Sequence, residues 1–172
     1  NIREVDAIIH VVRCFDDPNI VHVAGSVDPV FDKEVIDTEL EIKDLESVDK
    51  KIQKTARTAK AGDAKAKKEL ASLQRFKAHL EDGQNARTLY ASDDDLEAVE
   101  DLQLLTIKPV IYAANVDEAS IISGNSFVEA LKEHVKDENA EVVVISASIE
   151  AQIAEIEDPE EKEMFLSEYG LT

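Results

Sequence analysis

Three short apolar runs, each bounded by polar residues, predict the strands of one sheet. They span residues 7–13, 110–114 and 142–145, and they are rich in Val and Ile. Runs of this length and near-continuous apolarity are typical of parallel strands that are covered on both faces. We therefore expect a parallel sheet whose first strand is far from the others in sequence.

Helical patterns follow the second and third runs. Asn125 or Ser126 can cap a helix that continues to Val135. Asp158, with a proline directly after it, can begin another helix that Gly170 ends. Strands that alternate with helices predict the α/β class, with helices layered on the sheet.

The stretch between the first and second runs has a different pattern. From about Glu34 to Ala61 it contains no Gly or Pro, and after a Gly62-Asp63 turn a second charged stretch continues to Gly83. Apolar residues recur there in steps of three and four, namely Leu45, Val48, Ile52, Ala56 and Ala59, then Ala66, Leu70, Leu73 and Leu80. Two amphipathic helices joined by such a turn predict an antiparallel helical hairpin, with arms roughly 30–40 Å long.

These patterns give a domain organisation. We place the hairpin at residues 32–85, as an insertion into an α/β domain made of residues 1–31 and 86–172. The three consecutive aspartates at 93–95 can form the first turn of a helix, where carboxylates favour the helix dipole, or a solvated acidic loop. Because the sequence enters its first apolar run without an initiator Met, we expect it to begin inside a larger protein.

Charge is distributed unevenly along the chain. The net charge of −19 argues against a general affinity for nucleic acid over the whole surface. Eight of the 19 basic residues nevertheless lie between positions 50 and 68, with Asp63 as the only acid among them. They are Lys50, Lys51, Lys54, Arg57, Lys60, Lys65, Lys67 and Lys68. At the free end of the hairpin they predict either a surface that binds RNA or another polyanion, or an ordinary solvated helix tip.

Other residue types narrow the class of protein. Cys14 is the only cysteine, which excludes an internal disulfide, and its apolar surroundings predict a buried thiol. No apolar stretch reaches the roughly 20 residues of a membrane helix and no secretory signal is visible, so we expect a cytoplasmic protein without a membrane partner. We also expect it to be a monomer. His10, His22, His79 and His134 lack the neighbours typical of metal sites, and we expect no metal ligand and no catalytic residue here.

Polar residues follow the second and third apolar runs, where each strand should end. They are Asn115, Val116, Asp117 and Glu118 after the second run, and Ser146 and Ala147 after the third. Ligands of open α/β sheets bind beyond the carboxyl ends of the strands. GTPases carry Asn-Lys-x-Asp at the first position and Ser-Ala at the second, so the two segments can converge on a nucleotide base. Alternatively, Asn115 is a capping residue, a role that asparagine often fills.

Longer segments of the chain resemble the YchF/Obg-like ATPase family. They are residues 1–7, 10–15, 28–29, 34–40, 102–106, 108–110 and 143–147. The resemblance covers essentially all 172 residues. It implies a Ras-like nucleotide-binding domain interrupted by a coiled-coil arm, a P-loop ATP/GTP hydrolase of the translation-factor class, and the ribosome as a partner. Members of the family also carry phosphate and magnesium motifs upstream and a TGS domain downstream, which this sequence does not contain.

The altered base motif favours adenine over guanine. In GTPases an Asp at the fourth position accepts hydrogen bonds from the ring N–H and the exocyclic amine of guanine. Glu118 has one more methylene and would not place its carboxylate at the same point. Asn115 can still pair with the amine and N7 of adenine, and the methyl groups of Val116 can pack on the ring. The family resemblance agrees, since its members commonly favour ATP.

We therefore hold two hypotheses about function. In the first, the chain is the base-recognising part of an ATP- or GTP-binding hydrolase, with Asn115, Val116, Glu118, Ser146 and Ala147 at the base. The phosphates, Mg²⁺ and attacking water would then be held upstream, and the isolated chain would be inactive because it lacks the Gly-rich phosphate loop. The alternative is an interaction module that acts through its helical arm and binds no nucleotide.

Overall fold

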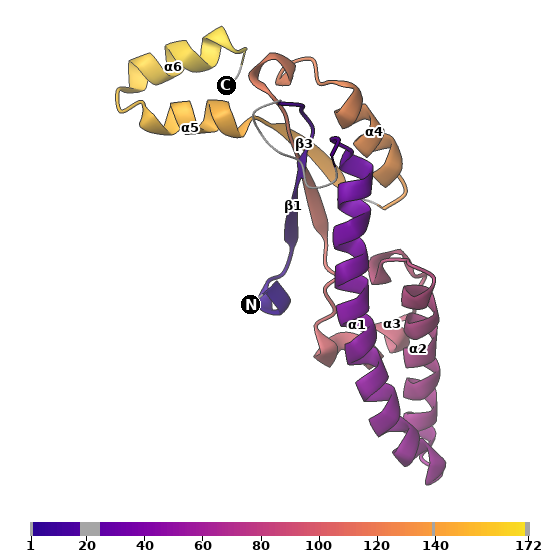
Figure 1. Cartoon of the computed structure of the whole chain (residues 1–172). Helices are drawn as coiled ribbons and strands as arrows, with labels where there is room; N and C mark the ends of the chain where they lie inside the picture. Colours follow the sequence, from indigo (N-terminus) through magenta and orange to yellow (C-terminus); the bar gives the residue numbers. More distant parts are fainter. Residues whose placement is uncertain (1, 18–24, 139, 171–172) are drawn as a thin grey trace. The chain divides into compact units, whose positions relative to one another are not determined.

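The computed structural model describes residues 2–17, 25–138 and 140–170 (Figure 1). His22, one of the residues considered above, lies outside the described residues. The chain forms two compact units, which we describe separately. The first comprises residues 2–8 and 34–109, and the second comprises the other described residues.

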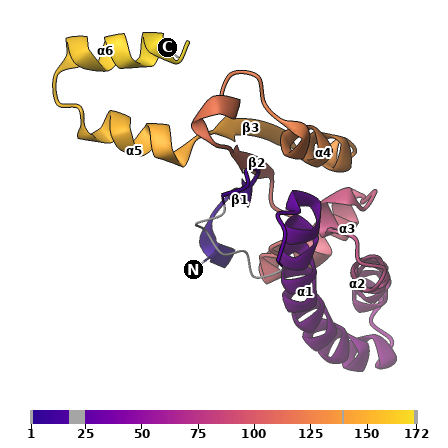
Figure 2. The ribbon, with the colours of Figure 1, turned by 45° about the horizontal axis from the view of Figure 1, so that its top comes forward.

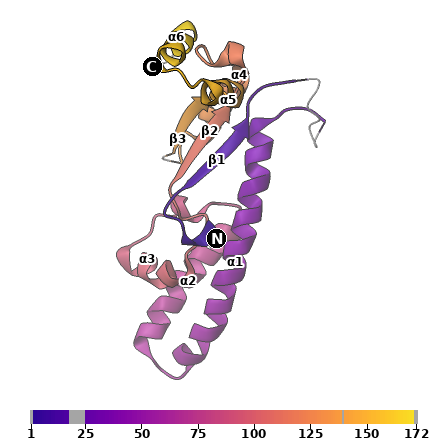
Figure 3. The same cartoon turned by 90° about the vertical axis from the view of Figure 1, so that its left-hand side faces the viewer.

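The predicted helical hairpin is present. Helices α1 (Pro29–Lys60) and α2 (Ala64–Glu81) run side by side and are joined by a tight turn (Figures 1 and 3). Gly62 in this turn has a φ of 99°, a backbone conformation that strongly favours glycine. Asp63 then caps α2 by accepting a hydrogen bond from the backbone N–H of Ala66 at 2.8 Å.

Helix α1 begins earlier than the sequence analysis expected. We expected it from about Glu34, whereas its first residue is Pro29. The carboxylate of Asp28 accepts a hydrogen bond from the backbone N–H of Phe31 at 3.0 Å, which satisfies one of the donors at the helix start. Proline at the first helical position needs no such partner, so the Asp-Pro pair begins the helix.

The facing stripes of the hairpin form the core of the first unit. The buried cluster comprises Val48, Leu73, Phe76, Leu80, Ala86, Val99 and Leu104. The last three come from the segment after α2, which includes helix α3 (Asp93–Val99) lying beside α2 (Figure 2). The compact unit therefore extends to residue 109, beyond the insertion of residues 32–85 that we expected.

The three aspartates at 93–95 form the first turn of helix α3, as the first of the two interpretations predicted. Ser92 is the N-cap, and its hydroxyl accepts a hydrogen bond from the backbone N–H of Asp95 at 3.3 Å. The Asp95 carboxylate in turn accepts from the backbone N–H of Ser92 at 2.9 Å, which completes a capping box. Arg75 on α2 pairs with the same carboxylate.

Buried carboxylates on α1 bind the segment that follows α2. Asp37 accepts a hydrogen bond from the side-chain amide of Asn85 at 2.9 Å. Asp44 is fully buried, and it accepts hydrogen bonds from the backbone N–H groups of Leu105 and Thr106 at 2.8 and 2.7 Å. These contacts satisfy buried backbone donors that have no partner in a helix or strand.

The second unit contains the predicted parallel sheet. Its strands are β1 (Ile8–Arg13), β2 (Val110–Asn115) and β3 (Glu141–Ile145), in the order β1-β2-β3. Strand β2 pairs in parallel with β3, with Asn115 opposite Ile145, so the carboxyl ends of both strands lie at the same edge.

Three helices follow the strands of this unit. They are α4 (Ser126–Val135), α5 (Ala147–Glu155) and α6 (Pro159–Glu168). Helix α4 buries Val128, Leu131 and Val135. Helix α5 leads away from the end of β3, and α6 runs back beside α5 (Figure 2). The predicted α/β fold, with a parallel sheet and an inserted helical hairpin, is confirmed.

Candidate functional site

Successive hydrogen bonds connect the carboxyl ends of the three strands. The backbone N–H of Cys14, after β1, donates to the carbonyl of Asn115 at 2.7 Å. The backbone N–H of Val116, after β2, donates to the carbonyl of Ile145 at 2.8 Å. Asn125, the N-cap of α4, donates its side-chain amide to the carbonyl of Cys14 at 2.7 Å. The loops beyond the sheet edge are thus held in fixed positions.

Asn115 lies at the centre of this edge. Its side-chain oxygen accepts a hydrogen bond from the backbone N–H of Ala147 at 2.9 Å. Ala147 is the first residue of α5, so Asn115 satisfies one of the unpaired donors of that helix. Its side-chain nitrogen donates no hydrogen bond to any of the described residues, and a ligand can therefore use it. The capping and the base-binding interpretations of Asn115 are compatible.

Val116 and Ser146 are covered by the protein. Val116 is only 2% exposed, which leaves little of its side chain to pack on a nucleotide base. Ser146 is 1% exposed, and its hydroxyl has no hydrogen-bond partner among the described residues. Of the two residues after β3, only Ala147 forms a hydrogen bond with the end of β2, through its backbone N–H and the side chain of Asn115.

Glu118 is bound by side chains from α5 and from the end of α6. One carboxylate oxygen accepts hydrogen bonds from the hydroxyl of Ser148 at 2.6 Å and the amide of Gln152 at 2.8 Å. The other oxygen accepts one from the hydroxyl of Tyr169 at 3.4 Å. These donors, Ser148 foremost, lower the pKa of Glu118 below its ordinary value. Glu118 is therefore an ionised carboxylate whose two oxygens both have partners.

Most of the basic residues near the hairpin turn are exposed. Among the described residues, Lys50, Lys54, Arg57, Lys60, Lys67 and Lys68 form no ion pair. Lys51 differs, because it donates to the carbonyl of Ala98 and pairs with Asp101 at 2.5 Å and with Glu69 at 2.9 Å. Lys51 is therefore used inside the first unit, and its neighbours are available to a partner.

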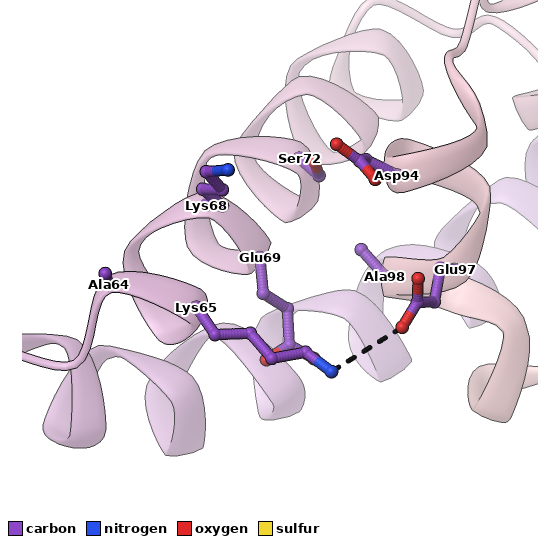
Figure 4. A pocket seen from close by; sticks show the side chains of 8 residues that line it. All are labelled: Ala64, Lys65, Lys68, Glu69, Ser72, Asp94, Glu97 and Ala98. Atoms are coloured by element: carbon purple, nitrogen blue, oxygen red, sulfur yellow. Dashed lines mark ion pairs between the residues drawn. The ribbon is translucent and has the colours of Figure 1, made fainter.

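Two hollows lie along the hairpin. The first, of about 510 Å³, lies between α2 and α3, and Figure 4 shows Lys65 reaching across it to Glu97 at 3.6 Å. The second, of about 700 Å³, is lined on α1 mainly by basic and hydroxyl side chains, namely Ser47, Lys50, Lys51, Lys54, Thr55 and Thr58. Because Glu69 and Asp101 also line this second hollow, its wall carries side chains of both charges.

His10, His79 and Cys14 each contact other parts of the protein. His10 lies in β1, with its ring centroid 5.6 Å from that of Tyr112. His79 shares a hydrogen bond of 2.8 Å with Thr88. The predicted burial of Cys14 is confirmed, and that burial raises the pKa of its thiol to about 11. The described residues contain no group of three or more His, Cys, Asp or Glu that could hold a metal ion. Nor does any helix among them have the length and apolarity needed to cross a membrane.

The fold and this sheet edge define a class of protein. A parallel α/β domain interrupted by a helical hairpin, with Asn and Ser-Ala at the ends of neighbouring strands, has the architecture of a GTPase-like domain. The chain aligns along 99% of its length with the solved structure of the YchF GTPase of Schizosaccharomyces pombe, with a TM-score of 0.86 and 31% sequence identity.

Sequence comparison finds similar proteins that share one name. The chain is 46% identical over 173 residues to the ribosome-binding ATPase YchF of Bacillus subtilis and 42% identical over 171 residues to that of Haemophilus influenzae, and each alignment covers 99% of the chain. No family model matches the chain. The chain spans about half the length of the relatives that it matches, 47% in each of these cases. The predicted resemblance to the YchF/Obg-like ATPase family is confirmed along nearly the whole chain.

Proposed function

We propose that this chain supplies the purine-recognising part of a ribosome-associated ATP/GTP hydrolase, with ATP preferred over GTP. The observation that carries the proposal is the position of Asn115, whose oxygen is held by the backbone N–H of Ala147 while its amide nitrogen remains available. A rigidly oriented amide donor can bind N7 of a purine, and the second lone pair of its oxygen can accept from the amine of adenine.

The chemistry of ATP hydrolysis requires groups beyond this site. Phosphate binding and Mg²⁺ coordination use a Gly-rich loop and hydroxyl or carboxylate ligands. The 172 residues contain no G-x-x-x-x-G-K-S/T segment. The residues that do fit a nucleotide are those of the base site, so within this chain we assign binding and orientation of the base and no catalytic step. A ribosomal partner would also place the protein in the cytoplasm.

The base site is tested by nucleotide binding to the product of the complete reading frame. Replacing Asn115 by Ala removes the amide and leaves the N–H of Ala147 without its partner. We expect ATP affinity to fall by roughly fivefold to a hundredfold, the range for loss of a bidentate contact to a base. Ser126→Ala, an exposed position at the start of α4 that leaves the Asn125 cap in place, is the matched control and should bind ATP as the parent does. Unchanged ATP affinity of the Asn115→Ala variant would refute the assignment.

We also propose that the hairpin tip binds a polyanion, with ribosomal RNA as the candidate that the relatives suggest. The observation behind it is that the tip carries exposed basic side chains without ion pairs among the described residues, on a chain whose net charge is −19. Contacts of this kind release counterions from the phosphate backbone, so binding should weaken steeply as salt rises.

Charge reversal tests the tip. The variant carries Glu at Lys54, Arg57, Lys60 and Lys67. The matched control carries Glu at four exposed lysines elsewhere, namely Lys43, Lys132, Lys136 and Lys162, so both variants change the net charge equally. We expect the tip variant alone to lose ribosome co-sedimentation and to show a smaller salt slope, by about 0.9 for each phosphate that it no longer neutralises. Equal loss in both variants would indicate a general charge effect and would exclude a specific role of the tip.

A further inference from the structure

Three donors from the C-terminal part of the second unit converge on one carboxylate. Ser148 and Gln152 lie one turn apart on α5, and Tyr169 follows the last residue of α6. All three donate to Glu118, which begins the short 3-10 helix Glu118–Ser120 after β2. The contacts join positions that are 30, 34 and 51 residues apart in the chain.

We propose that Ser148 and Gln152, assisted by Tyr169, are positioning residues that withhold the Glu118 carboxylate from guanine and thereby set the purine preference. The inference rests on the proposed function of this edge of the sheet as a base site. It places the determinant of specificity in α5 and at the end of α6, in addition to the residues after the strands.

The argument depends on which acceptors remain available. Guanine presents a ring N–H and an exocyclic amine side by side, and a carboxylate binds both by using its two oxygens. In this structure one oxygen of Glu118 accepts hydrogen bonds from both Ser148 and Gln152, which occupy its two lone pairs, and the other accepts one from Tyr169. Guanine would have to displace these donors or leave its own donors unpaired, and unpaired buried donors are costly. Adenine has no N–H at that ring position, so it does not need the carboxylate.

The protonation states agree with this arrangement. The hydrogen bond from Ser148 is the first cause of the lowered pKa of Glu118, so the carboxylate is charged at neutral pH. Burial, followed by the charge of Glu118, raises the pKa of Tyr169, which therefore remains a donor. Each oxygen of the carboxylate thus has a donor from the protein itself.

The test releases the carboxylate without removing it. Ser148→Ala combined with Gln152→Ala deletes both donors to the same oxygen, and alanine suits the helix in which they lie. Dissociation constants for ATP and GTP are measured on the product of the complete reading frame. We expect tighter GTP binding, unchanged ATP binding, and a fall of roughly fivefold or more in the ratio of the GTP to the ATP dissociation constant. Ser148→Thr, which keeps the hydroxyl, should retain the ratio of the parent.

Repeating the two alanine substitutions in a protein that lacks the Glu118 carboxylate shows whether they act through that carboxylate or through a general structural effect. In a Glu118→Ala protein the same two alanine substitutions should leave the ratio unchanged, because no carboxylate remains to be released. An equal change of the ratio in both backgrounds, or no change beyond about twofold in either, would overturn the inference while nucleotide binding itself stands. A parent that binds GTP as tightly as ATP would likewise overturn it. A parent that binds neither nucleotide would refute the proposed function as well.

Discussion

Asp44 should be among the residues whose loss costs the first unit most stability. It lies on the long charged helix α1, yet it is fully buried and accepts three hydrogen bonds from the segment after α3. Two donors are the backbone N–H groups of Leu105 and Thr106, and the third is the hydroxyl of Thr106. Replacing Asp44 by Ala leaves these donors buried without an acceptor.

The magnitude follows from counting those donors. An unsatisfied buried donor costs about 1–3 kcal/mol, so the two backbone N–H groups alone account for about 2–6 kcal/mol. Domains are stable by only about 5–15 kcal/mol, so the loss is a large part of the total. With a urea m-value of about 2 kcal/mol per molar, a loss of about 4 kcal/mol moves the midpoint by about 2 M.

Urea unfolding followed by far-UV circular dichroism measures this shift, because α1 and α2 give much of the helical signal. Glu39→Ala, an exposed carboxylate on the same helix, is the matched control and should stay within about 0.5 kcal/mol of the parent. Asp44→Asn retains one acceptor oxygen and should be affected less, which keeps the test valid if Asp44→Ala does not fold. A midpoint for Asp44→Ala equal to that of the control would show that these hydrogen bonds do not stabilise the unit.

Further predictions concern pH, the hairpin turn and activity. Donation from the backbone N–H of Ser92, followed by other donors, holds the pKa of Asp95 far below its ordinary value. The stabilising effect of the Asp95 carboxylate should therefore be complete above about pH 5 and fall as the pH drops below about 4. The stabilities of the Asp95→Asn variant and the parent, measured by unfolding at a series of pH values, should then converge in acid. A difference in stability that does not change with pH would contradict this. Gly62→Ala should lower stability by about 1–2 kcal/mol from its positive φ alone. An added Cβ there meets no atom within 4 Å, so a larger loss in thermal unfolding would point to a steric cause. The isolated chain should release no phosphate from ATP above a matched blank, and steady turnover by the pure chain would overturn the assignment of the chemistry to other segments.

The strands and the hairpin could be predicted because local patterns determine them. The Val- and Ile-rich runs become β1, β2 and β3, and the Gly62-Asp63 pair both forms the turn and caps α2. The start of α1 at Pro29 was missed, although Asp28 before a proline is a readable signal for a helix start. Local signals therefore explain these elements and also this error.

The buried charges could not be predicted in the same way. Lys33, Asp37, Glu41 and Asp44 recur about one turn apart on α1 and are all buried, whereas their charge suggested an exposed face. Their burial depends on partners that are distant in sequence, such as Thr106 for Asp44. The three donors to Glu118 also come from distant positions. The sequence therefore showed the motif after β2, but it did not show the hydrogen bonds that hold the Glu118 carboxylate in place.

Asn125 shows how few amino acids one position can accept. Its oxygen accepts from the backbone N–H of Val128 at 3.0 Å, and its nitrogen donates to the carbonyl of Cys14 at 2.7 Å. Aspartate would keep the first bond and bring a negative charge against that carbonyl, serine is too short to span both, and glutamine loses the geometry of a cap. Saturation mutagenesis of this partly exposed position should therefore yield a tolerance profile as narrow as that of a buried one.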